Sequence, residues 1–237
     1  MFTNLCREWS EKVLPHPPGL AHNRAMTDFP QPDFATKPTL VGGLVTLRPF
    51  RLPTDLPAIR ALLTDVEAAR YTEGDPGTTP RPPWSEEDER RMLAWYGTRH
   101  EQDDRLDLAV VDAATGDCVG EVVLNRWDRG NRSCSFRIGL IAAGRDRGLG
   151  TEALRLIAGH GFEQLGLHRI SLSVYGHNDR GLRCYRKVGF VLEGTRREAL
   201  RYGDRWVDDL DMAILDHEWE RHRGYPAGRP VPPSDPA

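Results

Sequence analysis

The sequence predicts a mixed α+β fold, in which a mostly antiparallel sheet is flanked by helices and contains one strand–helix–strand crossover. Two observations support this prediction. Residues 105–141 hold three strand-like segments separated by the turn sequences ATGD and DRGN, which is typical of an antiparallel meander. From residue 148 the apolar residues recur at helical spacing, and a strand, a second helix and a final hairpin follow.

One strand and two helices are expected before the meander. The segment LVTLRPF, residues 44–50, alternates like a strand. Residues 54–65 carry apolar side chains at helical spacing, with Thr54 or Asp55 as the expected N-cap. A second helix is expected to begin at Ser85, because serine is a favoured N-cap and acidic side chains fill the turn that follows.

The second half of the chain is predicted to mix helices and strands. Gly166 and Gly189 are natural helix ends, and Asn178 is a suitable N-cap for the shorter helix. The expected elements are a helix over 148–166, a strand over 168–174, a helix over 178–189, and strands over 190–200 and 205–215.

Composition sets the expected domain boundaries. Residues 44–223 are predicted to form one domain, 1–43 a flexible N-terminal extension and 224–237 a disordered tail rich in Pro and Gly, because neither end shows a sustained period. The net charge of -3 gives no argument for nucleic acid or membrane binding. Without an apolar signal segment at the N-terminus, a cytoplasmic protein is expected, and a homodimer is left open.

The cysteines are scattered. Cys6, Cys118, Cys134 and Cys184 form no CxxC pair and lie beside no histidine at metal-ligand spacing, so no metal site is expected and the thiols are expected to be idle in a reducing compartment. A covalent acyl-cysteine route is disfavoured, because neither Cys134 nor Cys184 has an obvious histidine partner.

The sequence RDRGLG, residues 145–150, lies where a strand gives way to a helix. Glycines allow close backbone approach, the helix N-terminus offers N–H groups, and two arginines indicate an anionic ligand. A Walker loop is absent, because no GK[ST] follows. The segment GLGTEA fits the dinucleotide fingerprint G-x-G-x-x-A, but a meander precedes it and no acid ends the next strand. A pyrophosphate loop of the form R-x-x-G-x-G, from Arg145, Gly148 and Gly150, is favoured.

This context resembles the GNAT superfamily of acetyl-CoA-dependent N-acetyltransferases over roughly residues 44–220. Asn178, Tyr185, Gly189 and Phe190 look like the family pattern N-x(6)-Y-x(3)-G-F, and the ending FVLEGTRREALRYGDRWVDDLDMAIL resembles the ribosomal-protein N-terminal acetyltransferase (Rim-type) branch. The resemblance implies a GNAT-like sheet with acetyl-CoA in a gap between splayed strands. It also implies transfer of the acetyl group to a primary amine, of a protein N-terminus or a small molecule, by direct attack in a ternary complex.

The resemblance also implies a set of contacts to acetyl-CoA. The pantetheine arm would pair with backbone at the end of one strand, the pyrophosphate would lie on N–H groups of the glycine loop beside two arginines, and an asparagine would bond to the pantetheine. The residues implied are Leu140, Ile141 and Ala142 for the strand end, Arg145, Arg147, Gly148, Leu149, Gly150 and Thr151 for the loop, and Asn178.

Two catalytic groups are expected. The resemblance implies that Tyr185 protonates the departing thiolate, although without the motif a packing role would be preferred. Relatives of this branch often carry Glu two residues before the strand glycine, and Arg137 occupies that position here. Glu121 is the expected substitute base, lying opposite Ile138 if DRGN forms a tight hairpin. His177 is the other candidate.

Two alternative functions are also compatible with the sequence. A non-catalytic module that binds or senses acyl-CoA would explain why Arg137 replaces the glutamate, whereas Tyr185 and Asn178 argue against it. An acyltransferase that uses another donor, such as succinyl-CoA, is also compatible with the motifs.

Overall fold

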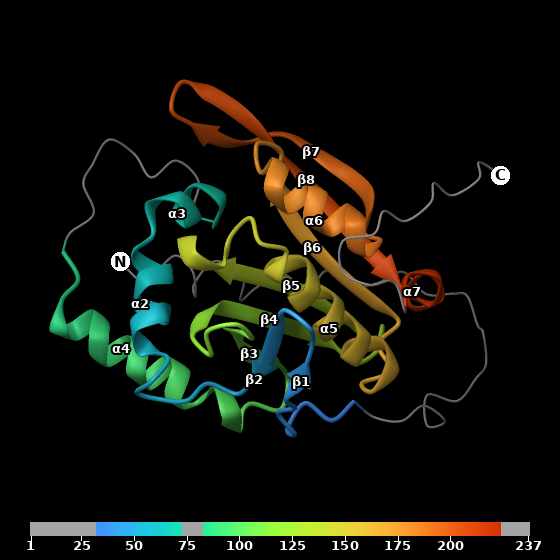
Figure 1. Cartoon of the computed structure of the whole chain (residues 1–237). Coiled ribbons are helices and arrows are strands. Elements are labelled where there is room, and N and C mark those ends of the chain that lie inside the picture. Colours follow the sequence, from blue (N-terminus) through green and yellow to red (C-terminus); the bar gives the residue numbers. More distant parts are fainter. Residues whose placement is uncertain (1–31, 73–82, 224–237) are drawn as a thin grey trace. The chain divides into compact units, whose positions relative to one another are not determined.

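The computed structural model describes residues 32–72 and 83–223, and structural statements below concern these residues. One eight-stranded sheet has the order β1-β2-β3-β4-β5-β6-β8-β7 (Figure 1). Neighbouring strands pair antiparallel except β5 and β6, which are parallel and joined by the predicted crossover. The strands are β1 Leu40–Val41, β2 Val45–Arg48, β3 Leu106–Asp112, β4 Cys118–Asp128, β5 Ser133–Leu140, β6 Arg169–Tyr175, β7 Val191–Tyr202 and β8 Arg205–Leu215. The predicted fold class is confirmed.

Six α-helices and two short 3-10 helices accompany this sheet within the described ranges. They are α2 Leu56–Thr64, α3 Val66–Thr72, α4 Glu86–Gly97, η2 Arg99–Glu101, η3 Ala142–Gly144, α5 Leu149–Glu163, α6 Asp179–Val188 and α7 Asp216–His222. The predicted start of α4 is confirmed, because Ser85 and Asp88 form a reciprocal capping box. Asp55 occupies the N-cap position of α2 without capping it, since its carboxylate pairs with Arg48. The sequence-based prediction missed α3 and α7.

Different helices pack against the two faces of the sheet. Successive side chains of β4 point to opposite faces: Val122 belongs to the main apolar core with the buried residues of α5, whereas Glu121 contacts Tyr96 of α4. A smaller apolar cluster of Ile59, Met92 and Tyr96 joins α2 and α4. Helix α5 therefore packs on one face, and α4 lies against the opposite one.

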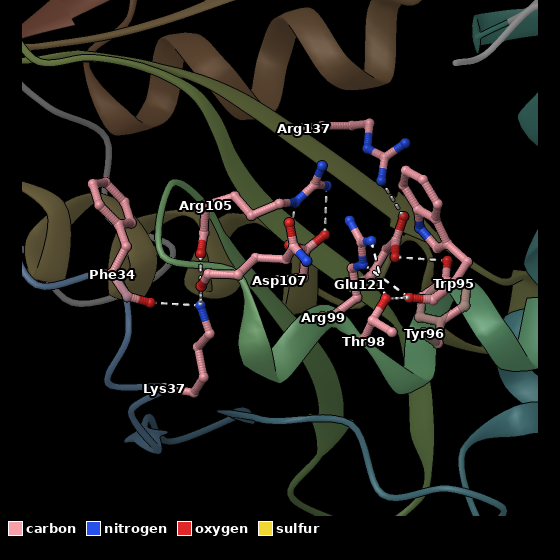
Figure 2. Close-up of polar contacts among 11 residues, drawn as sticks. Phe34, Lys37, Trp95, Tyr96, Thr98, Arg99, Arg105, Asp107, Glu121 and Arg137 are labelled. Atoms are coloured by element: carbon pink, nitrogen blue, oxygen red, sulfur yellow. Dashed lines mark hydrogen bonds and ion pairs between the residues drawn. The ribbon is translucent and has the colours of Figure 1, made fainter.

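The segment before residue 44 is packed, which corrects the predicted domain boundary. Phe34 is 1% exposed and belongs to the main core, and β1 pairs with β2. The ammonium group of Lys37 donates to the backbone carbonyls of Phe34, Gln102 and Arg105 at 2.5, 2.5 and 2.8 Å (Figure 2). The predicted flexible extension is thus wrong for residues 32–43. Residues 1–31 and the predicted tail, 224–237, lie outside the described residues.

A gap opens between β5 and β6. The two strands pair only from Ser133 to Ser135 with Arg169 to Ser171. Beyond that point β5 continues to Leu140 along β4, and β6 continues to Tyr175 along β8, with no further pairing between them in the described structure. The strands are splayed, as the family resemblance implies.

The register of β4 and β5 differs by one residue from the expected hairpin. Glu121 lies opposite Gly139, and Val122 lies opposite Ile138. The cause is an irregularity between Asn125 and Asp128, which shifts the pairing before the turn. The prediction that Glu121 faces Ile138 is therefore wrong.

Candidate active site

The N-terminus of α5 forms an anion site of the expected kind. Gly148 is its N-cap and has left-handed backbone angles, φ 83° and ψ -9°, which suit glycine. A Cβ at Gly150 would lie 3.2 Å from a methyl group of Leu140, so the helix end approaches β5 closely. The N–H groups of residues 147–150 have no acceptor among the described residues. Such unsatisfied N–H groups fit a phosphate.

Two predicted loop contacts differ in the structure. The N–H group of Thr151 donates to the carbonyl of Gly148 at 3.1 Å, so it is used inside the first turn. The Arg145 guanidinium donates to Leu140 O and Glu67 Oε2, both at 2.8 Å, and also to Asp65. Its side chain is 10% exposed. Arg145 therefore ties the loop to α3 and to the residue before it, and a phosphate contact from its side chain gains no support.

Arg147 is the accessible arginine of the loop. Its side chain is about half exposed, and Nη1 donates to Asp112 Oδ2 at 2.5 Å. The Ala114 N–H group and the Arg147 guanidinium together hold the pKa of Asp112 below its usual value. A small pocket beside Arg147 is also lined by Gly43 and Leu44.

The backbone that faces the gap lies earlier in β5 than expected. The N–H group of Ile141 donates to Val119 of β4, and pairing alternates along an antiparallel ladder. The N–H and C=O groups of Phe136 and Ile138 therefore point away from β4 and into the gap. Leu140 ends β5, and Ala142 begins the turn η3. The prediction that Ile141 and Ala142 offer a strand edge is corrected, because the chain has already turned.

Helix α6 carries the residues that match the N-x(6)-Y-x(3)-G-F pattern, beginning with its N-cap Asn178. Asn178 caps it, with Oδ1 accepting from the Gly181 N–H group at 2.9 Å, and Gly189 ends it with φ 107°. Both predicted helix ends are confirmed. The side-chain amide nitrogen of Asn178 donates to no described residue, so a contact to the pantetheine stays a prediction compatible with the cap.

Tyr185 of α6 is buried against the first β5 residue beyond the paired segment. Its ring lies edge-on to Phe136, with centroids 6.3 Å apart and planes at 83°, and also contacts Phe190. Burial raises the pKa of Tyr185 above its usual value. The hydroxyl therefore keeps its proton near neutral pH, and the ring that carries it lies beside Phe136, next to the closed end of the gap.

Glu121 and Arg137, which the sequence analysis treated separately, form one hydrogen-bonded group with Tyr96, in which Glu121 and Tyr96 are buried and Arg137 is partly exposed. The Tyr96 hydroxyl donates to Glu121 Oε2 at 2.9 Å, and Arg137 Nη2 donates to Glu121 Oε1 at 2.8 Å (Figure 2). Burial, and then the charge of Glu121, raise the pKa of Tyr96. Tyr96 was missed from the sequence, although its spacing of four from Met92 marks the buried face of α4.

His177 lies where three remote segments meet. Its Nε2 is 3.1 Å from the Arg70 carbonyl, which can only accept, so Nε2 carries the proton. Its Nδ1 is buried and has no hydrogen-bond partner in the described structure. The rings of Tyr71, Tyr175 and Tyr202 surround it at centroid distances of 5.4, 6.0 and 4.9 Å.

Burial favours the protonated form of the described thiols. Burial raises the pKa of Cys118 to about 11 and that of Cys134 to about 12, and it also raises the pKa of Cys184. No group of three metal-ligating side chains occurs in the described ranges. Within the same ranges, no helix is both long and apolar enough to cross a membrane.

An acyltransferase is the class of enzyme that the fold and comparisons with known proteins define. The chain belongs to the acetyltransferase (GNAT) domain family, whose model matches residues 45–191. It is an N-acyltransferase, and the resemblance found in its sequence is confirmed.

Two curated relatives and one solved structure illustrate the similarity. The probable N-acetyltransferase YjcK of Bacillus subtilis is 32% identical over 57% of this chain and 75% of its own length. The spermidine N(1)-acetyltransferase of Escherichia coli K12 is 28% identical over 51% of this chain and 63% of its own length. RimJ of Mycobacterium smegmatis, solved with CoA-disulfide, superimposes with a TM-score of 0.64 at 22% identity, covering 79% of this chain and 91% of RimJ. The last similarity shows that the two chains share a fold.

Proposed function

We propose that this enzyme transfers the acetyl group of acetyl-CoA to a primary amine by direct attack in a ternary complex. The observation that carries the proposal is the gap between β5 and β6, with the open N–H groups of α5 at one end and Tyr185 at the other. The RimJ structure named above contains CoA-disulfide, which supports a CoA thioester as the donor.

Acetyl-CoA is expected to lie along the gap. The N–H groups of Arg147, Gly148, Leu149 and Gly150 would hold the pyrophosphate, with Arg147 adding charge. The gap-facing backbone groups of Phe136 and Ile138 would pair with the pantetheine arm. Asn178 would contact the same arm from α6.

The chemistry assigned to the protein is proton transfer and polarisation. The neutral amine forms a C–N bond with the thioester carbon, and the C–S bond breaks. Tyr185 donates its proton to the leaving sulfur, which its buried, protonated state permits. A backbone N–H group of β5 polarises the carbonyl. The described cysteines keep their protons near neutral pH, which supports direct attack over an acyl-cysteine.

Glu121 is the proposed base that takes the proton from the amine. It is an ionisable group on β4, the strand next to β5, and it is held in place by Tyr96 and by Arg137 of β5. His177 is the second candidate, because its unpaired Nδ1 carries a lone pair. Replacing each residue separately by glutamine and comparing the pH dependence of turnover distinguishes them.

Two alternatives are separated by one assay. A module that only binds acyl-CoA would bind acetyl-CoA without releasing free thiol when amines are added. An enzyme specific for another donor would release thiol from succinyl-CoA faster than from acetyl-CoA.

The cytoplasmic location, the homodimer and the absence of membrane and nucleic acid partners stay predictions.

A further inference from the structure

Arg137 and Ser173 flank the gap at the same level. Ser135 and Ser171 are the last paired residues of β5 and β6, and Arg137 and Ser173 each follow two positions later on the same face. This is the face that also carries Glu121, whereas Phe136 and Leu172 point into the core on the α5 side. An acceptor that reaches the gap from the Glu121 face therefore passes between Arg137 and Ser173.

The accessible charge on the β5 side of the gap is positive. Glu121 has 8% of its side chain exposed, whereas its partner Arg137 has 39% exposed. The Glu121 carboxylate is therefore the more buried group of the pair, and the Arg137 guanidinium is the more exposed one. An acceptor therefore meets the arginine before the glutamate.

The β6 side of the gap also presents an arginine. Arg196 of β7 donates to Ser173 Oγ at 3.0 Å and to Asp209 at 2.6 Å. Arg196 is 48% exposed and Asp209 12%. Asp211 is half exposed and lies 3.2 Å from the same guanidinium. The acidic groups on this side are thus paired, and one of them is covered.

The acidic residues near Leu140, where β5 ends, are also paired with arginines. Asp65 and Glu67 contact the Arg145 guanidinium, and Glu67 also binds Arg180 of α6 at 2.9 Å. A polyamine with several ammonium groups would have to displace arginines from these carboxylates, and like charges brought together cost free energy. The arrangement disfavours a polycationic acceptor.

We propose that the acceptor is a small amine with a carboxylate beside its amino group, as in a free amino acid, and that Arg137 binds this carboxylate. The inference rests on the proposed N-acetyl transfer and names its acceptor class. Arginine is suited to the role because its planar guanidinium binds carboxylates in a fixed geometry through five N–H donors. Arg137 would thereby orient the amine toward the thioester while continuing to hold Glu121.

The test compares L-phenylalanine, L-phenylalaninamide and spermidine as acceptors, by release of free thiol from acetyl-CoA. The wild type is expected to favour the acid over the amide by about tenfold or more in kcat/KM, which corresponds to about 1.4 kcal/mol. Basicity cannot cause this preference, because the negative carboxylate stabilises the ammonium form and leaves less neutral amine. Spermidine is expected to be the poorest acceptor.

Variants separate recognition from general damage. Arg137→Gln should remove the preference mainly through a higher KM for the acid, and Arg137→Lys should restore part of it. Arg90→Gln is the matched control, because Arg90 is an exposed arginine of α4 paired with Glu87 on the surface. A preference for the acid that survives in Arg137→Gln, a wild-type ratio near one, or faster reaction of spermidine would overturn the inference while leaving N-acetyl transfer intact. Absence of thiol release with every amine would overturn both.

Discussion

The ring of Tyr185 lies edge-on against Phe136, at the point where β5 leaves β6. Replacing Tyr185 by phenylalanine keeps this packing and removes only the hydroxyl. We expect turnover to fall by about a hundredfold or more, the usual contribution of a general acid, while affinity for acetyl-CoA stays nearly unchanged. Turnover and calorimetric affinity measure the two effects. Unchanged turnover, with chemistry shown by rapid quenching to limit the rate, would assign Tyr185 to packing.

Gly150 tests the anion site. We expect Gly150→Glu to abolish acetyl-CoA binding, because a side chain there fills the space beside Leu140 and adds negative charge at a phosphate site. Gly194→Glu is the control, since a Cβ at Gly194 meets no atom within 4 Å. Calorimetry should register binding for the control alone, provided that both variants melt like the wild type. Retained affinity in Gly150→Glu would place the pyrophosphate elsewhere.

The pH dependence of turnover tests which residue takes the proton from the amine. In Glu121→Gln the amine must lose its proton to water, so turnover should rise steeply with pH up to the pKa of the acceptor amine, which is about 7.7–8.0 for a peptide N-terminus and higher for a free amino acid. The wild-type profile should be flatter over that range. His177→Gln serves as the comparison and should resemble the wild type. If His177→Gln gives the steep profile instead, His177 is the base.

The acid makes its own pH prediction. Burial raises the pKa of Tyr185 above its usual value of about 10, so its hydroxyl stays protonated in neutral and mildly alkaline solution. Turnover with saturating substrates should therefore show no decline between pH 7 and pH 10 that depends on Tyr185. A decline in that range that disappears in Tyr185→Phe would show that the tyrosine ionises there.

Phe34 tests the corrected domain boundary. Its ring is buried in the main core, so Phe34→Ala should lower the free energy of unfolding by about 3–5 kcal/mol. Val41→Ala, at an exposed position of β1, should change it by less than about 0.5 kcal/mol. Urea unfolding measures both. Equal, small effects would mean that the segment before residue 44 contributes little to the fold.

The sequence predicted correctly the helix ends that are marked by capping residues. Ser85 marks the start of α4, and Asn178 and Gly189 mark the ends of α6, because caps depend on neighbouring residues alone. Helices α3 and α7 have seven residues each, too few to show a helical period clearly. Phe34 lies in a segment without periodicity, so its burial had no local signal.

The partners within the site depend on the fold rather than on local sequence. Arg145 pairs with Asp65, eighty residues earlier in the chain, and no motif in either segment specifies the other. The irregularity after Asn125 moved Glu121 by one position against β5. Predicting the loop glycines and Tyr185 needed only the family motif, whereas the charge state of the site required knowing which arginine reaches which carboxylate.

The central claim is acetyl transfer to an amine, and release of free thiol from acetyl-CoA, with and without amines, tests it most directly. Thiol release that requires an amine, accompanied by one N-acetylated product per thiol in mass spectrometry, is the predicted result. Binding of acetyl-CoA with no thiol release in any amine, or release at the same rate without an amine, would contradict it.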